Sequence, residues 1–245
     1  MPRLARAAGA LAALVAPLAL APAARAQASA APASYDFFGT FARDNDVRLF
    51  QFVLGAGRFT VETLSYGGGT TASGATVARG GFDTRLLLYD ANGDYLDYFD
   101  DSGPNQQYDP TTDQAYDAGF NEGFFFNPLL PGTYYVALVQ YDNFNGGNLF
   151  ADGFSYDGQP FFTNDPTFTS NNPGVCPSGA FRDVSDVTSY PQAYCRTGNF
   201  ALTFTGDAIL SARDLSASAL PEPATALLVA PALAGAALLR RRRRA

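Results

Sequence analysis

The chain has 245 residues, of which 23 are acidic and 16 are basic, and its formal net charge is −7. All the basic residues are arginines, because the sequence contains neither Lys nor His, and it also lacks Trp. Imidazole bases, imidazole metal ligands and Schiff-base lysines are therefore excluded, and with them most familiar hydrolase, zinc and haem chemistry. Abundant Gly, Tyr and Phe, with only 16% charged residues, favour strands joined by turns.

The first 26 residues are typical of a secretory signal peptide. Arg3 and Arg6 precede an uncharged apolar run over residues 7–24, and Ala24-Arg25-Ala26 places small residues at both positions that a signal peptidase reads. Two prolines and the lack of a polar face argue against a helix of the folded domain. We therefore expect signal peptidase to cleave after Ala26 and remove residues 1–26 during export. Cleavage after Ala30, at Ala28-Ser29-Ala30, is the alternative.

The C-terminus carries a second apolar segment with its own charged end. Pro221-Glu222-Pro223 precedes residues 224–239, in which Thr225 is the only polar residue. Five arginines follow: Arg240, Arg241, Arg242, Arg243 and Arg244. A helix over the apolar segment would be about 24 Å long, short of the ~30 Å hydrocarbon core but sufficient for a strained or temporary span. The arginines predict a short transmembrane helix with a cytoplasmic end.

This three-part pattern resembles the PEP-CTERM sorting signal of Gram-negative bacteria, over residues 221–245. The resemblance implies recognition by an exosortase-type processing enzyme while the tail sits in the inner membrane, and cleavage near Pro221, Glu222 and Pro223. It also implies delivery to the cell surface or the extracellular matrix. A plain membrane anchor that is never cut is the alternative.

Removal of both ends would make the remaining chain strongly acidic. Residues 27–220 keep 22 acidic residues and eight arginines, so their net charge is near −14. A surface of this charge repels phosphate backbones, and we expect no nucleic-acid partner. Divalent cations are its natural counter-ions.

Cys176 and Cys195 are the only cysteines, and both lie in the part expected to be exported. An even number of cysteines in an oxidising compartment predicts a disulfide, and two cysteines allow only one intramolecular pairing. The bond would close a loop of about twenty residues and stabilise the fold by ~3 kcal/mol. Two free buried thiols are the alternative.

Alternating apolar residues predict an all-β domain over residues 35–210, between linkers at 27–34 and 211–220. Residues 48–54 place Phe50, Phe52 and Leu54 on one side of a strand. Phe59 and Val61 continue the alternation after a Gly-Ala-Gly turn, which is typical of a hairpin.

Four further segments show strand patterns. Residues 86–89 and 95–99 flank an Asn-Gly turn and predict a hairpin. Residues 134–141 are apolar on both faces, which predicts a central strand. Residues 200–204 alternate as a closing strand before a glycine.

Three motifs in this region resemble the bacterial pre-peptidase C-terminal domain over residues 35–208. They are Phe82-Asp83 before Leu-Leu-Leu-Tyr-Asp, then Asp100-Asp101-Ser102, and then Pro-Gly-Thr-Tyr-Tyr-Val-Ala-Leu beginning at Pro131. The resemblance implies a jelly-roll-like antiparallel β-sandwich that serves as an accessory or binding module. Residues 142–198 depart from it, because they form a long insertion rich in Gly, Asn and Pro that contains both cysteines.

A dense group of aspartates suggests a calcium site. Its members are Asp83, Asp90, Asp94, Asp97, Asp100 and Asp101. Hard oxygen ligands suit Ca²⁺, but the EF-hand pattern fails because Gly93 is the fourth position from Asp90 rather than the sixth. We take Asp83, Asp100 and Asp101, at predicted strand ends, as the candidate calcium ligands. The alternative is that these acids fill turns and keep the surface soluble.

The insertion also offers aromatic residues for sugar binding. Tyr141, Phe144 and Tyr156 are interleaved with Asp and Asn residues, and this combination stacks on sugar faces and hydrogen-bonds their hydroxyls. Packing of the same aromatics onto the sandwich is the alternative.

The sequence predicts no enzymatic activity. Asp100 and Asp101 are neighbours on a strand and point to opposite faces, so they do not form the carboxylate pair of a glycosidase. We therefore expect a non-catalytic, exported, surface-sorted β-sandwich with a structural or adhesive role. A secreted carbohydrate-binding module that recognises exopolysaccharide is the alternative.

Overall fold

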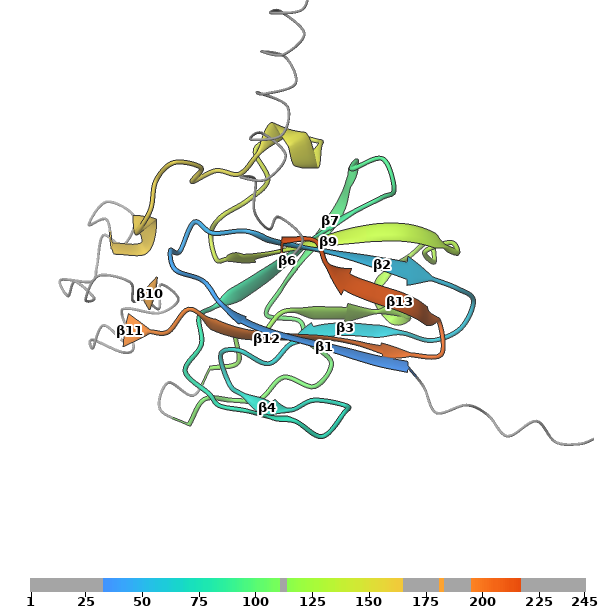
Figure 1. Cartoon of the computed structure of the whole chain (residues 1–245), viewed down its shortest axis with the longest axis horizontal. Helices are drawn as coiled ribbons and strands as arrows, with labels where there is room; N and C mark the ends of the chain where they lie inside the picture. The colour runs from blue at the N-terminus through green and yellow to red at the C-terminus, as the bar shows by residue number, and fades with distance from the viewer. Residues whose placement is uncertain (1–32, 111–113, 165–180, 183–194, 217–245) are drawn as a thin grey trace, which may run out of the picture. The chain divides into compact units, whose positions relative to one another are not determined.

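Two antiparallel sheets face each other across an aromatic core in the computed structural model (Figure 1). The structure describes residues 33–110, 114–164, 181–182 and 195–216. The predicted signal peptide and the sorting tail, with Pro221, Glu222, Pro223 and the arginines 240–244, lie outside these residues. So does Cys176.

The first sheet has four strands in the order β1-β12-β3-β8, and the second has five in the order β13-β2-β9-β6-β7. Every pair of neighbours is antiparallel. The strands of the first sheet are β1 (Ala33–Thr40), β12 (Asn199–Gly206), β3 (Thr60–Thr63) and β8 (Gly119–Asn121). Those of the second are β13 (Ile209–Asp214), β2 (Arg48–Leu54), β9 (Gly132–Gln140), β6 (Thr84–Tyr89) and β7 (Tyr95–Asp100). The expected all-β sandwich is confirmed.

Short elements decorate the two sheets. Two small ribbons pair β4 (Gly69–Thr70) with β5 (Thr76–Val77), and β10 (Phe181–Arg182) with β11 (Cys195–Arg196). Three 3₁₀ turns are η1 (Glu122–Phe124), η2 (Phe150–Asp152) and η3 (Phe162–Asn164). In the described ranges, no helix has the length and apolar character needed to cross a bilayer.

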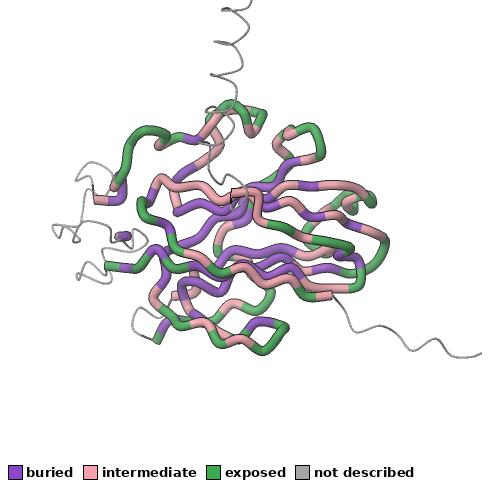
Figure 2. Tube along the Cα trace, viewed as in Figure 1, coloured by how far each residue is buried: buried purple, intermediate pink, exposed green. Residues whose placement is uncertain are grey.

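The main core lies between the sheets and is built from phenylalanines. Phe52 and Phe50 of β2 pack against Phe204 of β12, with ring centroids 5.4 Å and 6.3 Å away. Phe99 of β7 stacks on Phe120 of β8 at 4.3 Å. Figure 2 shows the buried residues running along the facing strands. Alternation along each strand directs these rings inward, as the sequence pattern predicted.

A second apolar cluster covers the outer face of the five-stranded sheet. Leu87 and Tyr89 of β6, with Ala137 and Val139 of β9, meet Phe154 of the insertion. Both faces of β6 and β9 are therefore buried, which explains why their sequences are apolar at successive positions. The start of the insertion packs onto the sheet instead of extending away from it.

Several predicted elements are confirmed and one pairing is wrong. β2 has the predicted bounds, β6 and β7 form the predicted hairpin, and β9 lies between β2 and β6 as a central strand. The expected hairpin of β2 with β3 does not form, because the turn after Leu54 carries the chain into the opposite sheet. The alternation of apolar residues shows which face of a strand is buried, but it does not show which strand lies beside it. β2 and β3 bury their apolar faces in the same core from opposite sheets.

The sandwich is longer than predicted at both ends. β1 begins at Ala33, inside the expected linker 27–34, and pairs with β12 over its whole length. β13 runs to Asp214, and the Leu215 N–H then donates to the Leu49 carbonyl at 2.8 Å, so the boundary at residue 210 is too early. Both are edge strands, and backbone pairing with β12 and β2 defines where they begin and end.

Replacing Phe50 by Ala tests the core. Phe50 is fully buried, so Phe50→Ala should lower the free energy of unfolding by about 3–5 kcal/mol. Phe38→Ala is the matched control, because the Phe38 side chain is 55% exposed, and its cost should stay below about 1 kcal/mol. Urea denaturation of both variants measures the difference. Equal losses would contradict this assignment of the core.

Candidate functional site

The predicted calcium ligands Asp83, Asp100 and Asp101 lie together. Each offers a carboxylate oxygen, and these atoms all lie within 4.8 Å of one another. The β6–β7 hairpin explains this, since antiparallel pairing sets Asp100 opposite Arg85, two residues after Asp83. Asp83 is buried, Asp100 is half-buried and Asp101 is exposed, so the trio opens from the protein toward solvent.

The remaining aspartates of the group have other positions. Asp90 closes the β6–β7 turn, where its Oδ1 accepts the backbone N–H groups of Asn92 at 2.8 Å and Asp94 at 3.0 Å. Asp97 is exposed on β7, and its Oδ1 accepts the N–H of Tyr98 at 2.9 Å. Asp90 therefore stabilises a turn, as the alternative to a calcium site predicted. The candidate calcium ligands Asp83, Asp100 and Asp101 lie at the ends of β6 and β7.

Arg85 is a buried cation beside the trio. Its side chain is 2% exposed, and its guanidinium pairs with Asp100 at 2.5 Å and with Asp142 at 3.4 Å. A buried charge needs such partners, because removal from water without them costs several kcal/mol. Asp142 comes from the start of the insertion, so this ion pair ties the insertion to the sheet.

Two of the three candidate sugar-binding aromatics pack on Arg85. The Arg85 guanidinium carbon lies 3.8 Å from the Phe144 ring centroid and 4.5 Å from that of Tyr141, with Tyr98 at 5.3 Å. Cation–π attraction of this kind strengthens when the cation is desolvated. Tyr156 lies apart from them and stacks on Phe162 at 3.9 Å, with the ring planes 4° from parallel. Each of these half-buried rings thus uses one face for a contact within the protein.

Negative charge outweighs positive charge around the trio. Among the described residues, Arg85 pairs with Asp100 and Asp142, and Asp83 and Asp101 lie beside Asp100, so these four carboxylates and one guanidinium sum to a formal charge of −3. Burial raises the pKa of Asp100 above its usual value, although the hydrogen bond and charge of Arg85 oppose this. The Oδ1 atom of Asp100 is buried, and it has no hydrogen-bond partner within the described part of the chain. A divalent cation would offset both the repulsion and the desolvation, and carboxylates are ligands that Ca²⁺ prefers.

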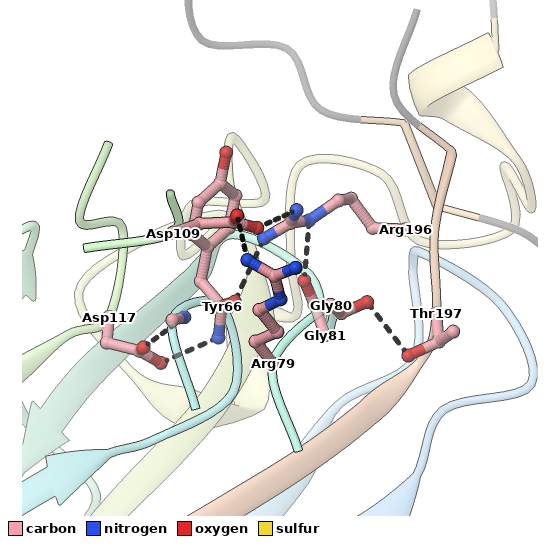
Figure 3. Close-up of polar contacts among 9 residues, drawn as sticks. Tyr66, Arg79, Gly80, Gly81, Asp109, Asp117, Arg196 and Thr197 are labelled. Carbon is pink, nitrogen blue, oxygen red and sulfur yellow. Dashed lines mark hydrogen bonds and ion pairs between the residues drawn. The ribbon is translucent and has the colours of Figure 1, made fainter. Parts of the chain in front are cut away.

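A second charged network, which the sequence did not predict, surrounds Arg196 of β11 (Figure 3). Arg196 donates to Asp109 at 2.7 Å, to the Gly81 carbonyl at 2.9 Å and to the Tyr66 carbonyl at 3.0 Å. Its guanidinium carbon also lies 3.5 Å from the Tyr66 ring centroid. Arg79 pairs with the other oxygen of Asp109 at 3.4 Å. These contacts join segments that are far apart in the chain and indicate a structural role.

Asp117 organises the loop beside this network. Its carboxylate accepts the backbone N–H groups of Tyr66 at 3.0 Å and Gly67 at 2.9 Å, and the Thr63 hydroxyl at 3.0 Å. Burial raises the pKa of Asp117, and these hydrogen bonds oppose the shift. In the sequence, Asp117 stands in a long polar segment, and its composition does not show which groups the Asp117 carboxylate binds.

The disulfide remains a prediction. Cys195 lies in β11, directly before Arg196, and Cys176 is outside the described residues. Arg196, the next residue, contacts the Gly81 carbonyl and Asp109 and so places this part of the insertion against the sandwich.

No protein-family model matches the chain, and no curated protein matches its sequence.

Arg85→Lys tests the buried ion pair. Lysine keeps the positive charge but lacks the planar guanidinium that reaches Asp100 and Asp142 together. The free energy of unfolding should therefore fall by about 2–3 kcal/mol. Arg58→Lys is the matched control because the Arg58 side chain is 91% exposed, and its effect should stay within about 0.5 kcal/mol. Thermal and urea unfolding measure both. An unchanged free energy of unfolding in Arg85→Lys would show that the planar guanidinium is not required for the pairing.

Proposed function

We propose that the protein is a non-catalytic, exported component of the cell surface or extracellular matrix, with a structural or adhesive role. Its jelly-roll-like sandwich would be stabilised by calcium after export. The observation that carries this proposal is the carboxylate trio Asp83, Asp100 and Asp101 within a surplus of negative charge. A cation held there would cross-brace the β6–β7 hairpin.

Calcium at this site would make stability depend on the surroundings of the protein. A ligand that binds only the native state raises the free energy of unfolding as its concentration rises above the dissociation constant. Three carboxylates supply part of the six to eight oxygens that Ca²⁺ takes, and water can supply others. The fold would therefore reach its full stability where free calcium is available.

The two ends of the chain support export and sorting. The segment 1–26 has the pattern of a signal peptide, and Pro221-Glu222-Pro223 with the terminal arginines has that of a PEP-CTERM tail. We propose signal peptidase and an exosortase-type enzyme as processing partners, with temporary insertion of the tail in the inner membrane. The acidic charge of residues 27–220 then suits a soluble, cation-binding surface.

The carbohydrate-binding alternative gains little from Tyr141, Phe144 and Tyr156. The first two rings pack on Arg85 and the third stacks on Phe162. A sugar would have to displace these contacts or use the opposite faces or the edges of the rings.

Calcium should stabilise the purified protein. At a calcium concentration about a hundredfold above the dissociation constant, the free energy of unfolding should rise by ~2.7 kcal/mol. Thermal unfolding in Ca²⁺ and in EGTA measures the rise, and calorimetric titration measures the binding. Asp101→Asn removes one charge of the trio and should abolish most of the rise. Asp97→Asn, an exposed aspartate on the same hairpin, should leave it intact.

The calcium proposal fails if neither binding heat nor a higher melting temperature appears. It also fails if Asp101→Asn and Asp97→Asn respond to calcium alike, since the stabilisation would then come from general charge screening.

Intact mass spectrometry of host fractions tests sorting. The proposal expects an extracellular or surface product close to residues 27–220 in mass. Replacing Pro221 and Pro223 by Ala should block processing and retain the longer chain in the inner membrane. An uncut C-terminus in the unaltered protein would instead identify a permanent membrane anchor.

A further inference from the structure

A mostly apolar pocket of about 270 Å³ lies on the outer face of the five-stranded sheet. Strands β2, β6 and β9, the β6–β7 turn and the segment around η2 all contribute to it (Figure 1). Its lining includes Leu49, Tyr135, Leu149, Phe150 and Ala151. The described residues that line it include no charged side chain. Such a lining favours an uncharged, apolar occupant.

Hydrogen bonds hold the walls of the pocket in place. The Gly93 carbonyl accepts the Phe150 N–H at 2.9 Å, and the Asn148 carbonyl accepts the Tyr95 N–H at 2.8 Å. The Phe150 ring also meets the Tyr89 ring edge-on, with centroids 5.6 Å apart. The pocket is therefore formed before an occupant enters it, which lowers the entropic cost of binding.

The last described residues of the chain lie against Leu49, which lines this pocket. The Leu215 N–H donates to the Leu49 carbonyl at 2.8 Å, and the Leu49 N–H donates to the Ser216 hydroxyl at 2.9 Å. These two hydrogen bonds fix the point from which the C-terminal segment leaves the sheet. The residues that follow Ser216 therefore start their path beside the pocket.

The residues after Ser216 have the composition that the pocket favours. Residues 217–220 are Ala-Ser-Ala-Leu, so they carry no charge, and Leu220 is their one large apolar side chain. Four extended residues span at most about 14 Å. Neighbouring strands lie about 4.8 Å apart, and the pocket lies over β2 and β9, the first and second strands from β13. Leu220 can therefore reach the pocket while β13 stays paired.

Two arguments favour the protein's own segment over a separate molecule. A four-residue tether holds Leu220 near the pocket at an effective concentration of about 1 mM or more, which a separate ligand would have to match. A second copy of the protein would bring a net charge near −14 on residues 27–220 against an equally acidic surface, so repulsion opposes its approach.

We propose that Leu220 of the same chain occupies this pocket, so that the C-terminal segment folds back onto the outer face of the five-stranded sheet. Docking buries the Leu220 side chain against Leu49 and Phe150. It also holds Pro221-Glu222-Pro223 beside the sandwich, so a processing enzyme meets this motif at a fixed position. The docking depends neither on calcium nor on cleavage of the tail.

Disulfide trapping in the full-length protein tests the position of Leu220. Ala151→Cys on the pocket wall is combined with Leu220→Cys, and peptide mapping by mass spectrometry identifies the bond after mild oxidation. Ala56→Cys with Leu220→Cys is the matched control, because Ala56 is also exposed but lies beyond the opposite end of β2 from Leu49. The first pair should form an intramolecular disulfide at least about tenfold faster than the control pair. Equal rates, or a bond that joins two chains, would overturn the proposal.

Thermal unfolding in EGTA distinguishes a docked leucine from one that only passes close to the pocket. In the full-length protein, Leu220→Asp should lower the melting temperature by about 3–6 °C, because a charge replaces a buried apolar side chain. Leu130→Asp is the matched control, since the Leu130 side chain is 74% exposed, and it should change the melting temperature by less than about 1 °C. An unchanged melting temperature in Leu220→Asp contradicts docking.

A second variant on the pocket wall shows whether the two sites are in contact. Leu149→Asp places a charge in the lining and should prevent docking. Combining it with Leu220→Asp should lower the melting temperature no further than Leu149→Asp alone, because the contact is already lost. Fully additive losses would show that Leu220 acts elsewhere and would overturn the proposal.

Discussion

The burial of Arg85 is the constraint on which the arrangement of the sandwich and its insertion depends. A guanidinium with a 2% exposed side chain must have charged partners, and Asp100 of β7 and Asp142 of the insertion meet that need. The aromatic rings of Tyr141 and Phe144 complete the enclosure. Asp142, Phe144 and Tyr141 lie at the start of the insertion. Their contacts with Arg85 therefore hold this segment against the five-stranded sheet.

The same interaction links the structural role of the insertion to the candidate calcium site. Asp100 is shared between Arg85 and the carboxylate trio, so it takes part in both the ion pair and any cation binding. A second buried arginine, Arg196, makes a similar set of contacts. It donates to Asp109 and to the carbonyls of Gly81 and Tyr66, which are far from Arg196 in the chain. In both cases a buried arginine connects segments that are far apart in the chain, Arg85 with Asp142 and Arg196 with Asp109, and its directional donors specify how they meet.

Local patterns explain which features were predictable. The trio was found because Asp83 and Asp100 flank one hairpin, whose Asn-Gly turn and apolar first strand are visible in the sequence. The pairing of β2 with β3 was wrong because alternation identifies the buried face and not the neighbouring strand. The aromatics of the insertion were read as ligand-binding because their partner, Arg85, lies far away in the chain. The extent of β13 was missed because backbone pairing at an edge leaves little trace in side-chain pattern.

The sequence by itself determined the all-β class, the extent of β2, the β6–β7 hairpin and the trio of carboxylates, because each of these depends on period-two alternation or on residues close in the chain. It also determined the absence of histidine and lysine chemistry. Only the tertiary structure decided which strands share a sheet, where Arg85 and Arg196 find their partners, and that Tyr89, Tyr135 and Phe150 line one pocket. These features join residues from distant segments, and their contacts arise only when the sheets and the insertion pack together.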